Sequence, residues 1–211
     1  MMPAPARFIS FEGGEGAGKS TQAKRLASAL EARGVAVCAT REPGGSPGAE
    51  QIRKLLVEGE PNRWDALTET LLMFAARADH LAQTIRPALA AGRWVVCDRF
   101  TDSTYAYQGA GRGIAAKTIA AIESASVQNL KPDMTLILDV PVGTGLSRAG
   151  ARSGGATRFE HFDEAFHTRL REFFHVLAQR DPARCILIDS TATPDAVAAQ
   201  IWQTVADRFR F

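Results

Sequence analysis

The sequence predicts an α/β fold of three layers, in which a five-stranded parallel sheet is flanked by helices on both faces. Five short runs of β-prone residues recur along the chain, at 8–11, 35–40, 94–97, 134–139 and 185–189. Segments of helical character separate or follow them, at 21–32, 67–90, 117–128, 162–179 and 195–209. Strands that alternate with helices are typical of a parallel sheet covered on both faces. Ligands of such sheets bind beyond the carboxyl ends of the strands, which is where functional residues are expected.

Length and composition indicate one core domain over residues 1–211. Hydrophobic residues make up 45% and charged residues 23% of the chain, as in ordinary globular proteins. A net charge of +2 gives no indication of a nucleic-acid or membrane partner. The apolar runs are too short to cross a bilayer and the N-terminus lacks the blocks of a secretory signal, so we expect a cytoplasmic location. Cys38, Cys97 and Cys185 are expected as buried free thiols, and the four histidines have no metal-ligand spacing.

A phosphate-binding loop is the most specific motif. It fits G-x-x-x-x-G-K-[ST], lies between a predicted strand and a predicted helix, and consists of Gly13, Gly14, Glu15, Gly16, Ala17, Gly18, Lys19 and Ser20. Its backbone N–H groups and the helix N-terminus would surround a polyphosphate. Lys19 would reach the β- and γ-phosphates, and the Ser20 hydroxyl would hold Mg²⁺.

Charged residues follow two other strands. Asp98, at the end of the third strand, is a candidate to hold Mg²⁺ through water, or is only a turn residue. Arg99 beside it carries a fork of donors that suits a phosphoryl group. Arg41 follows the second strand and precedes Pro43 and two glycines, where a small anion could approach, although a solvated surface arginine is equally consistent.

A helix and a glycine-rich loop supply further candidates. Met73 and Phe74 lie four and three residues before Arg77, so either apolar side chain can share a helix face with the guanidinium. That arrangement suits a planar heterocycle, or is plain core. Residues 150–155 combine glycines with arginine, as a flap that closes over phosphates would, or form an exposed loop; residues 109–113 form a second glycine loop.

These blocks together resemble bacterial thymidylate kinases over nearly the whole chain. The blocks occur in the family's order and spacing, and are FEGGEGAGKS from Phe11, TREPGG from Thr40, FAAR from Phe74, DRF from Asp98 and YAYQGAGRG from Tyr105. The resemblance implies a nucleoside-monophosphate-kinase-like P-loop fold with a lid at about 148–160. It implies transfer of the γ-phosphoryl group of ATP to dTMP, with Mg²⁺, giving ADP and dTDP for dTTP synthesis, and a homodimer.

The resemblance also implies roles for single residues. Arg41 and Arg99 would bind the dTMP phosphate, and Arg77 would donate to an oxygen of thymine. Glu15 would contact the 3′-hydroxyl, and Tyr107 would lie under the sugar, followed by Gln108 as a further substrate contact. Lys19, Arg99 and Arg152 would be the catalytic residues.

Family members differ in where the catalytic arginine lies. Gly16 stands where one class has an arginine in the P-loop, so the chain is similar to the class with a basic lid. Arg152 would then stabilise charge on the transferred group, and Arg148 would flank adenine. Two positions depart from relatives: Met73 stands where several have the thymine-stacking Phe, so we expect Phe74 to stack, and Gly150 replaces a third lid arginine.

Three other functions are compatible with a P-loop. A regulatory GTPase would need an Asn-Lys-x-Asp tetrapeptide, which the chain lacks. The chain could instead be a kinase for another nucleotide or for a nucleoside, which a substrate panel would distinguish. The Arg41 block favours an acceptor that already carries phosphate. A non-catalytic ATP-binding module could keep the P-loop, but it would have no need of the lid arginines.

Overall fold

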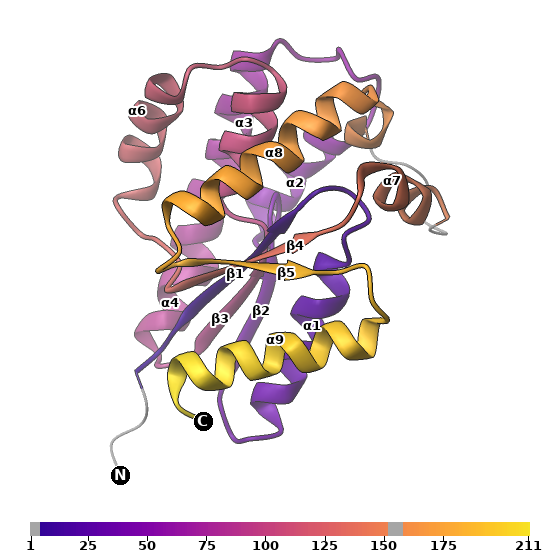
Figure 1. Ribbon diagram of the computed structural model, residues 1–211. Coiled ribbons are helices and arrows are strands. Elements are labelled where there is room, and N and C mark those ends of the chain that lie inside the picture. The colour runs from indigo at the N-terminus through magenta and orange to yellow at the C-terminus, as the bar shows by residue number, and fades with distance from the viewer. Residues whose placement is uncertain (1–4, 152–157) are drawn as a thin grey trace.

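The central sheet has five strands, all parallel. The computed structural model describes residues 5–151 and 158–211. The strands are β1 (Phe8–Gly13), β2 (Val37–Arg41), β3 (Trp94–Asp98), β4 (Met134–Asp139) and β5 (Cys185–Asp189), in the order β2-β3-β1-β4-β5. The strand that leads into the P-loop is therefore central, with β3 on one side and β4 on the other (Figure 1). The predicted α/β class and all five predicted strands are confirmed.

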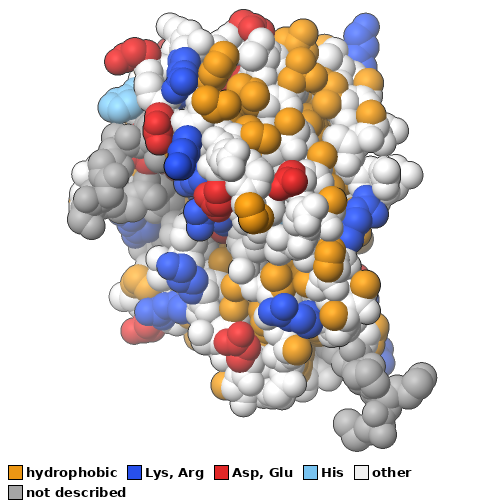
Figure 2. Space-filling model, turned by 180° about the vertical axis from the view of Figure 1, so that it is seen from behind, with side chains coloured by type: hydrophobic (Ala, Val, Ile, Leu, Met, Phe, Trp, Pro, Cys, Tyr) orange, Lys and Arg blue, Asp and Glu red, His pale blue; other side chains and the backbone are white. Residues whose placement is uncertain are grey.

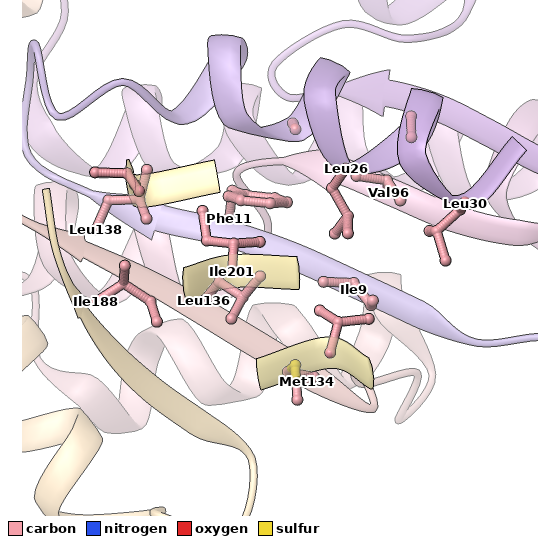
Figure 3. Packing of buried hydrophobic residues seen from close by; sticks show 14 of the residues in the cluster. Ile9, Phe11, Leu26, Leu30, Val96, Met134, Leu136, Leu138, Ile188 and Ile201 are labelled. Carbon is pink, nitrogen blue, oxygen red and sulfur yellow. The ribbon is translucent and has the colours of Figure 1, made fainter. Parts of the chain in front are cut away.

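Helices cover both faces of this sheet, and alternate strand residues contact each cover (Figure 1). Helices α1 (Lys19–Glu31) and α9 (Pro194–Phe209) lie on one face. Ile9, Phe11 and Leu136 pack there against Leu26 of α1 and Ile201 of α9, as Figure 3 shows. The opposite face carries α2 (Pro47–Val57), α3 (Ala66–His80), α4 (Arg86–Ala90), α6 (Ala116–Val127) and α8 (Glu164–Arg180).

Several segments differ from the sequence-based expectation. Helix α2 was not predicted, because it begins with Pro47 and Gly48, which resemble a turn, yet Pro47 occupies the first turn, where a missing N–H costs nothing. The helix expected at 67–90 is α3, a π-helical turn η1 (Leu81–Ile85) and α4, and α4 has Pro87 in its first turn. The prediction of a glycine loop at 109–113 was wrong in part. Helix α5 (Thr101–Thr104) leads into η2 (Tyr105–Gly111), which includes residues 109–111 of that loop, and a Cβ on Gly111 would meet Phe166 at 2.3 Å.

Two short helices border the segment 152–157. Helix α7 (Val142–Gly150) includes Arg148, and the 3-10 turn η3 (Arg158–His161) follows. All three cysteines are free, with Cys97 and Cys185 buried. Among residues 5–151 and 158–211, no helix has the length and hydropathy needed to span a bilayer.

Candidate active site

A cavity of about 350 Å³ opens at the carboxyl ends of β1, β2 and β3. It lies where a parallel sheet of this order is expected to bind ligands. Most predicted site residues line it, joined by some that were not predicted; the lining includes Glu15, Gly16, Gly18, Lys19, Ser20, Arg41, Glu42, Arg53, Met73, Arg77, Asp98, Arg99, Tyr107, Gln108, Arg148, Phe159 and Glu160. Phe74 is absent from this lining, and Arg152 lies outside the described residues.

The P-loop is shaped by close contact with α7. Gly16 has a φ of +65°, and a Cβ there would meet the carbonyl oxygen of Gly145 at 1.9 Å. A side chain at this position would require α7 to move, which gives a physical reason for glycine where other family members have arginine. Gly18 has a φ of +92° and immediately precedes α1, whose N-terminus therefore faces the loop.

Lys19 is held inside the loop. Its side chain is buried, and Nζ donates to the Gly14 carbonyl at 2.5 Å. Burial, and next the charge of Arg99, lower the pKa of Lys19 from 10.5 to about 8. A polyphosphate would replace the lost hydration of this ammonium group.

Ser20 and Asp98 meet across the sheet edge. The Ser20 hydroxyl donates to Oδ2 of Asp98, while Asp98 Oδ1 is buried and has no hydrogen-bond partner among the described residues. A hydroxyl next to an acceptor-rich carboxylate is a donor set that Mg²⁺ accepts when phosphates and water complete its shell. Within the described part of the chain, no group of three or more His, Cys, Asp or Glu side chains could hold a metal. The residues present therefore fit a cation shared with phosphate rather than one enclosed by protein.

Arg99 adopts an uncommon backbone conformation, with a φ of +73°. Its NH2 donates to Glu15 Oε1 at 2.9 Å, and its NH1 lies 3.2 Å from Ser103 Oγ. The guanidinium also lies 4.7 Å from the centre of the Tyr107 ring. The Tyr107 hydroxyl donates to the same Glu15 oxygen at 2.8 Å. Arg99, Glu15 and Tyr107 thus form one connected group on the cavity wall.

Glu12 supports the turn that carries Arg99. Its two oxygens accept from the Phe100 N–H at 2.7 Å and from the Ser103 hydroxyl at 2.5 Å. Burial, and next the charge of Asp102, raise the pKa of Glu12 from 4.5 to about 8. Glu12 was not predicted from the sequence, although a glutamate between a β-prone run and the P-loop glycines was an available signal.

The wall formed by α3 corrects one expectation. Phe74 is 2% exposed and packs in the core with Phe8 and Phe100, whereas Met73 lines the cavity. Consecutive helical residues point about 100° apart, so these two side chains cannot both face the cavity. Met73 therefore lines the cavity where the sequence led us to expect Phe74, and Phe74 belongs to the core.

Arg77 and Gln108 line the same cavity as Met73. Arg77 is 3% exposed, and Gln108 is fully buried. The Gln108 amide nitrogen donates to Glu69 Oε1 at 2.9 Å, while its Oε1 has no hydrogen-bond partner in the described part of the chain. Because Glu69 holds the amide nitrogen, Gln108 Oε1 has a fixed position and can accept a hydrogen bond from a ligand.

Two arginines reach the cavity from the β2 side. The Arg41 side chain is half exposed, and its NH2 lies 3.0 Å from Glu50 Oε1. Arg53 of α2 donates to the Pro43 carbonyl at 2.7 Å, and burial lowers its pKa. Arg53 was missed because α2 itself was not predicted.

Arg148 lies at the opposite end of the cavity. Its NH1 and NH2 donate to the carbonyls of Ser190 at 2.8 Å and Thr191 at 3.2 Å, so α7 is joined to the loop before α9. Phe159 and Glu160 of η3 also line the cavity.

Comparison with known proteins agrees with this geometry. The family model for thymidylate kinase matches residues 11–201. The chain belongs to the thymidylate kinase family. Thymidylate kinase of Caulobacter vibrioides is 58% identical over 201 residues, covering 95% of this chain and 96% of that protein. Thymidylate kinase of Bradyrhizobium sp. (strain BTAi1) is 53% identical over 208 residues, covering 98% and 92%. The crystal structure of thymidylate kinase from Ehrlichia chaffeensis matches with a TM-score of 0.78 and 33% identity, covering 95% of this chain and 98% of that one.

Family membership agrees with the resemblance inferred from the sequence, and it gives the cavity two expected ligands. The thymidylate kinase motifs contribute residues from five separate segments, which only the sheet brings together. Glu12 and Glu42 lie within the motif blocks but were assigned no role from the sequence, and Arg53 lies in none of the blocks. Each is charged and largely buried beside a predicted arginine or its turn, so its place depends on tertiary structure.

Proposed function

We propose a division of roles among the residues of this cavity in the reaction of the family. The chain is a dTMP kinase: it phosphorylates dTMP to dTDP, with ATP as the phosphoryl donor. The observation that carries the assignment of roles is that one cavity is lined both by the P-loop residues Lys19 and Ser20 and by Arg41, Arg77 and Arg99. A donor triphosphate and an acceptor monophosphate can therefore lie end to end.

On the donor side, the P-loop and Lys19 bind the β- and γ-phosphates. The partly desolvated ammonium group of Lys19 is pre-positioned by its hydrogen bond to Gly14. Arg148 lies beside the loop at Ser190 and Thr191, a position suited to the adenine end of ATP. We assign Arg152, in the proposed lid at about 148–160, to the charge that develops on the transferred group.

We propose Mg²⁺ as the cofactor at Ser20 and Asp98. The unpartnered Oδ1 of Asp98 and the adjacent Ser20 hydroxyl support this assignment. The ion would neutralise charge on the β- and γ-phosphates. The contact between Ser20 and Asp98 keeps both oxygens at the edge of the P-loop.

On the acceptor side, Arg99 and Arg41 bind the dTMP phosphate. Glu15, anchored by Arg99, and the Tyr107 ring contact the sugar. Arg99 is the more rigid of the two arginines, because Glu15 and Ser103 hold its guanidinium, whereas within residues 5–151 and 158–211 Arg41 pairs only with Glu50, at an exposed position. Arg99 therefore fixes the acceptor, and Arg41 contributes mainly affinity.

At the base end, Met73 packs on thymine in place of an aromatic ring. Arg77 donates to a thymine oxygen, and the free Oε1 of Gln108 accepts from the ring N–H. Gln108 is suited to this role because Glu69 holds its amide nitrogen, which leaves the oxygen directed away from that carboxylate.

This site does not require a general base. The acceptor oxygen of a monophosphate is already ionised at pH 7, so catalysis depends on alignment and on positive charge around the transferred group. A closed lid would exclude water and suppress hydrolysis of ATP.

We also propose a homodimer and a cytoplasmic location. Leu67 and Leu71, four residues apart on α3, are 45% and 50% exposed, and Leu55 of α2 is 39% exposed. Figure 2 shows the side of the molecule that carries these helices, and hydrophobic side chains gather on its upper part. Apolar surface of this kind is typical of an interface. Light scattering after size exclusion should give twice the chain mass, and Leu71→Glu should give a monomer; a monomeric wild type would reject the proposal.

A substrate panel tests the assigned reaction. Purified protein with ATP and Mg²⁺ should release ADP fastest with dTMP, more slowly with other nucleoside monophosphates, and not with thymidine. Equal rates with all monophosphates would reject the proposed base contacts. Absence of ADP release with dTMP would reject the assigned activity itself.

A further inference from the structure

Glu42 is a buried carboxylate between two basic side chains, and the mechanism above gives it no role. It follows β2, and Glu42, Arg77 and His80 are 5%, 3% and 0% exposed. Glu42 Oε2 accepts from Arg77 Nε at 2.6 Å, and Oε1 lies 3.0 Å from His80 Nδ1. Both oxygens of this carboxylate are therefore used by neighbours.

The pairing leaves Arg77 with a fixed set of free donors. A guanidinium has five N–H groups. Arg77 donates Nε–H to Glu42, one NH1 hydrogen to Thr104 Oγ1 at 3.0 Å, and one NH2 hydrogen to the Phe100 carbonyl at 3.1 Å. These partners come from separate segments, so they fix the plane of the group. The two remaining N–H groups belong to a side chain that lines the cavity.

His80 fixes the orientation of Glu42 in turn. Its Nε2 lies 2.7 Å from Thr40 Oγ1. Because Nδ1 faces a carboxylate, Nδ1 carries the proton and Nε2 accepts from the Thr40 hydroxyl. The backbone N–H of Glu42 also donates to the Asp98 carbonyl at 2.9 Å, which joins the main chain to the end of β3.

Gly45 permits the close packing of its backbone against His80 and Thr40. A Cβ on Gly45 would lie 2.3 Å from His80 Nε2 and 2.4 Å from Thr40 Oγ1. The chain Thr40, His80, Glu42 and Arg77 is therefore continuous and closely packed, and Glu42 and Arg77 line the cavity.

We propose that Glu42, oriented by His80, is a positioning residue that determines base specificity. It presents Arg77 as a rigid donor, which selects a pyrimidine with a carbonyl oxygen at ring position 4 over one with an amino group there. An amino group would place donor against donor, and Arg77 could not turn away from it without breaking its bond to Glu42. The charge of Glu42 also balances that of Arg77, so an uncharged base meets no unpaired buried cation. This proposal rests on the proposed function.

The test compares dTMP with 5-methyl-dCMP, which keeps the methyl group and replaces the 4-carbonyl with an amine. The variant is Glu42→Gln. Glutamine has one acceptor oxygen, so it cannot accept from both Arg77 and His80. We expect kcat/KM for dTMP to fall at least about tenfold, with 5-methyl-dCMP unchanged or improved, so that the ratio of the two falls at least about tenfold.

Matched variants separate positioning from general damage. Glu50→Gln weakens a different carboxylate–arginine pair, that of Arg41, and should lower kcat/KM for both nucleotides by the same factor, leaving their ratio unchanged. His80→Leu should lower the ratio as Glu42→Gln does, and His80→Gln, which keeps an N–H donor, should restore part of it. If Glu42→Gln does not fold, the two His80 variants decide the question through the same ratio.

An equal loss for both nucleotides in the Glu42 and His80 variants would overturn the proposal, because a merely structural role predicts that result. An unchanged ratio in folded variants would overturn it as well. Failure of the proposed function is distinguishable, since the wild type would then not phosphorylate dTMP at all.

Discussion

The hydroxyl of Ser20 donates a hydrogen bond to a carboxylate oxygen of Asp98, 78 residues away in the sequence. Ser20 lies in the first turn of α1 and Asp98 ends β3, and the two meet because β1 pairs with β3 in parallel, with Phe11 opposite Asp98. The pairing register therefore sets the distance between the P-loop and the carboxylate. Ser20 and Asp98 can act together only because the sheet brings their two segments side by side.

Replacing Ser20 with Ala should raise the Mg²⁺ concentration that gives half-maximal rate. The variant removes one proposed metal ligand and the hydrogen bond that orients the other, so we expect an increase of about 10- to 100-fold. Initial rates measured over a range of Mg²⁺ at saturating dTMP would show it. Ser28→Ala, on the exposed face of α1 and outside the cavity lining, is the control, and an unchanged Mg²⁺ requirement in Ser20→Ala would contradict the assignment.

Replacing Arg152 with Ala should lower kcat by about 10³-fold, the loss expected for an arginine that stabilises transferring phosphoryl charge. Stopped assays with purified protein at saturating ATP and dTMP would measure the loss. Arg148→Ala is the comparison: it removes an arginine assigned to adenine, so it should raise KM for ATP more than it lowers kcat. Equal effects of the two variants on kcat would argue against a distinct role for Arg152.

The fold was largely predictable because its signals are local. Each strand is a short β-prone run, and β1 is followed by a P-loop motif whose spacing already implies a strand, a loop and a helix. Helix α2 was not predicted because its first two residues, Pro47 and Gly48, are typical of a turn. Gly111 was assigned to a loop because glycines are common in loops. The structure shows instead that the Phe166 ring leaves no space for a side chain at this position.

The site divides in the same way. Lys19, Ser20 and Arg99 lie in motifs whose chemistry can be read from spacing alone. Glu12 and Glu42 could not be assigned, because their partners come from segments distant in the sequence. Which of two adjacent residues faces a cavity depends on how the helix is rotated about its axis against the sheet. The sequence does not show this rotation, so the aromatic residue Phe74 was expected to face the cavity instead of Met73.

The placement of these two residues predicts opposite effects of alanine. Met73→Ala should raise KM for dTMP with little change in the unfolding midpoint, since Met73 lines the cavity. Phe74→Ala should lower the free energy of unfolding by about 3–5 kcal/mol, because it leaves a void in the core beside Phe8 and Phe100. Urea denaturation and steady-state kinetics on both variants would separate the two. The reverse pattern would restore Phe74 as the side chain that contacts the base.

Glu12 predicts how stability depends on pH. Burial, followed by the charge of Asp102, raises the pKa of its carboxyl group from 4.5 to about 8 in the folded state. Between these values the unfolded chain has released the proton while the native protein keeps it, so rising pH favours unfolding. The contribution is complete below pH 4.5 and is lost as the pH rises through about 8.

Glu12→Gln should remove this dependence, because glutamine resembles the protonated acid and does not ionise. From pH 5 to pH 9, the free energy of unfolding of the wild type should fall relative to that of the variant, on the order of a few kcal/mol. Asp139→Asn is the control: the hydrogen bond from Arg171 lowers the pKa of Asp139 below its usual 3.8, so its contribution is constant from pH 5 to pH 9 and is lost only as the pH falls below about 3.8. Urea unfolding followed by tryptophan fluorescence at several pH values measures both. A constant difference between wild type and Glu12→Gln would mean that Glu12 is ionised throughout, and that a charged carboxylate holds the Arg99 turn.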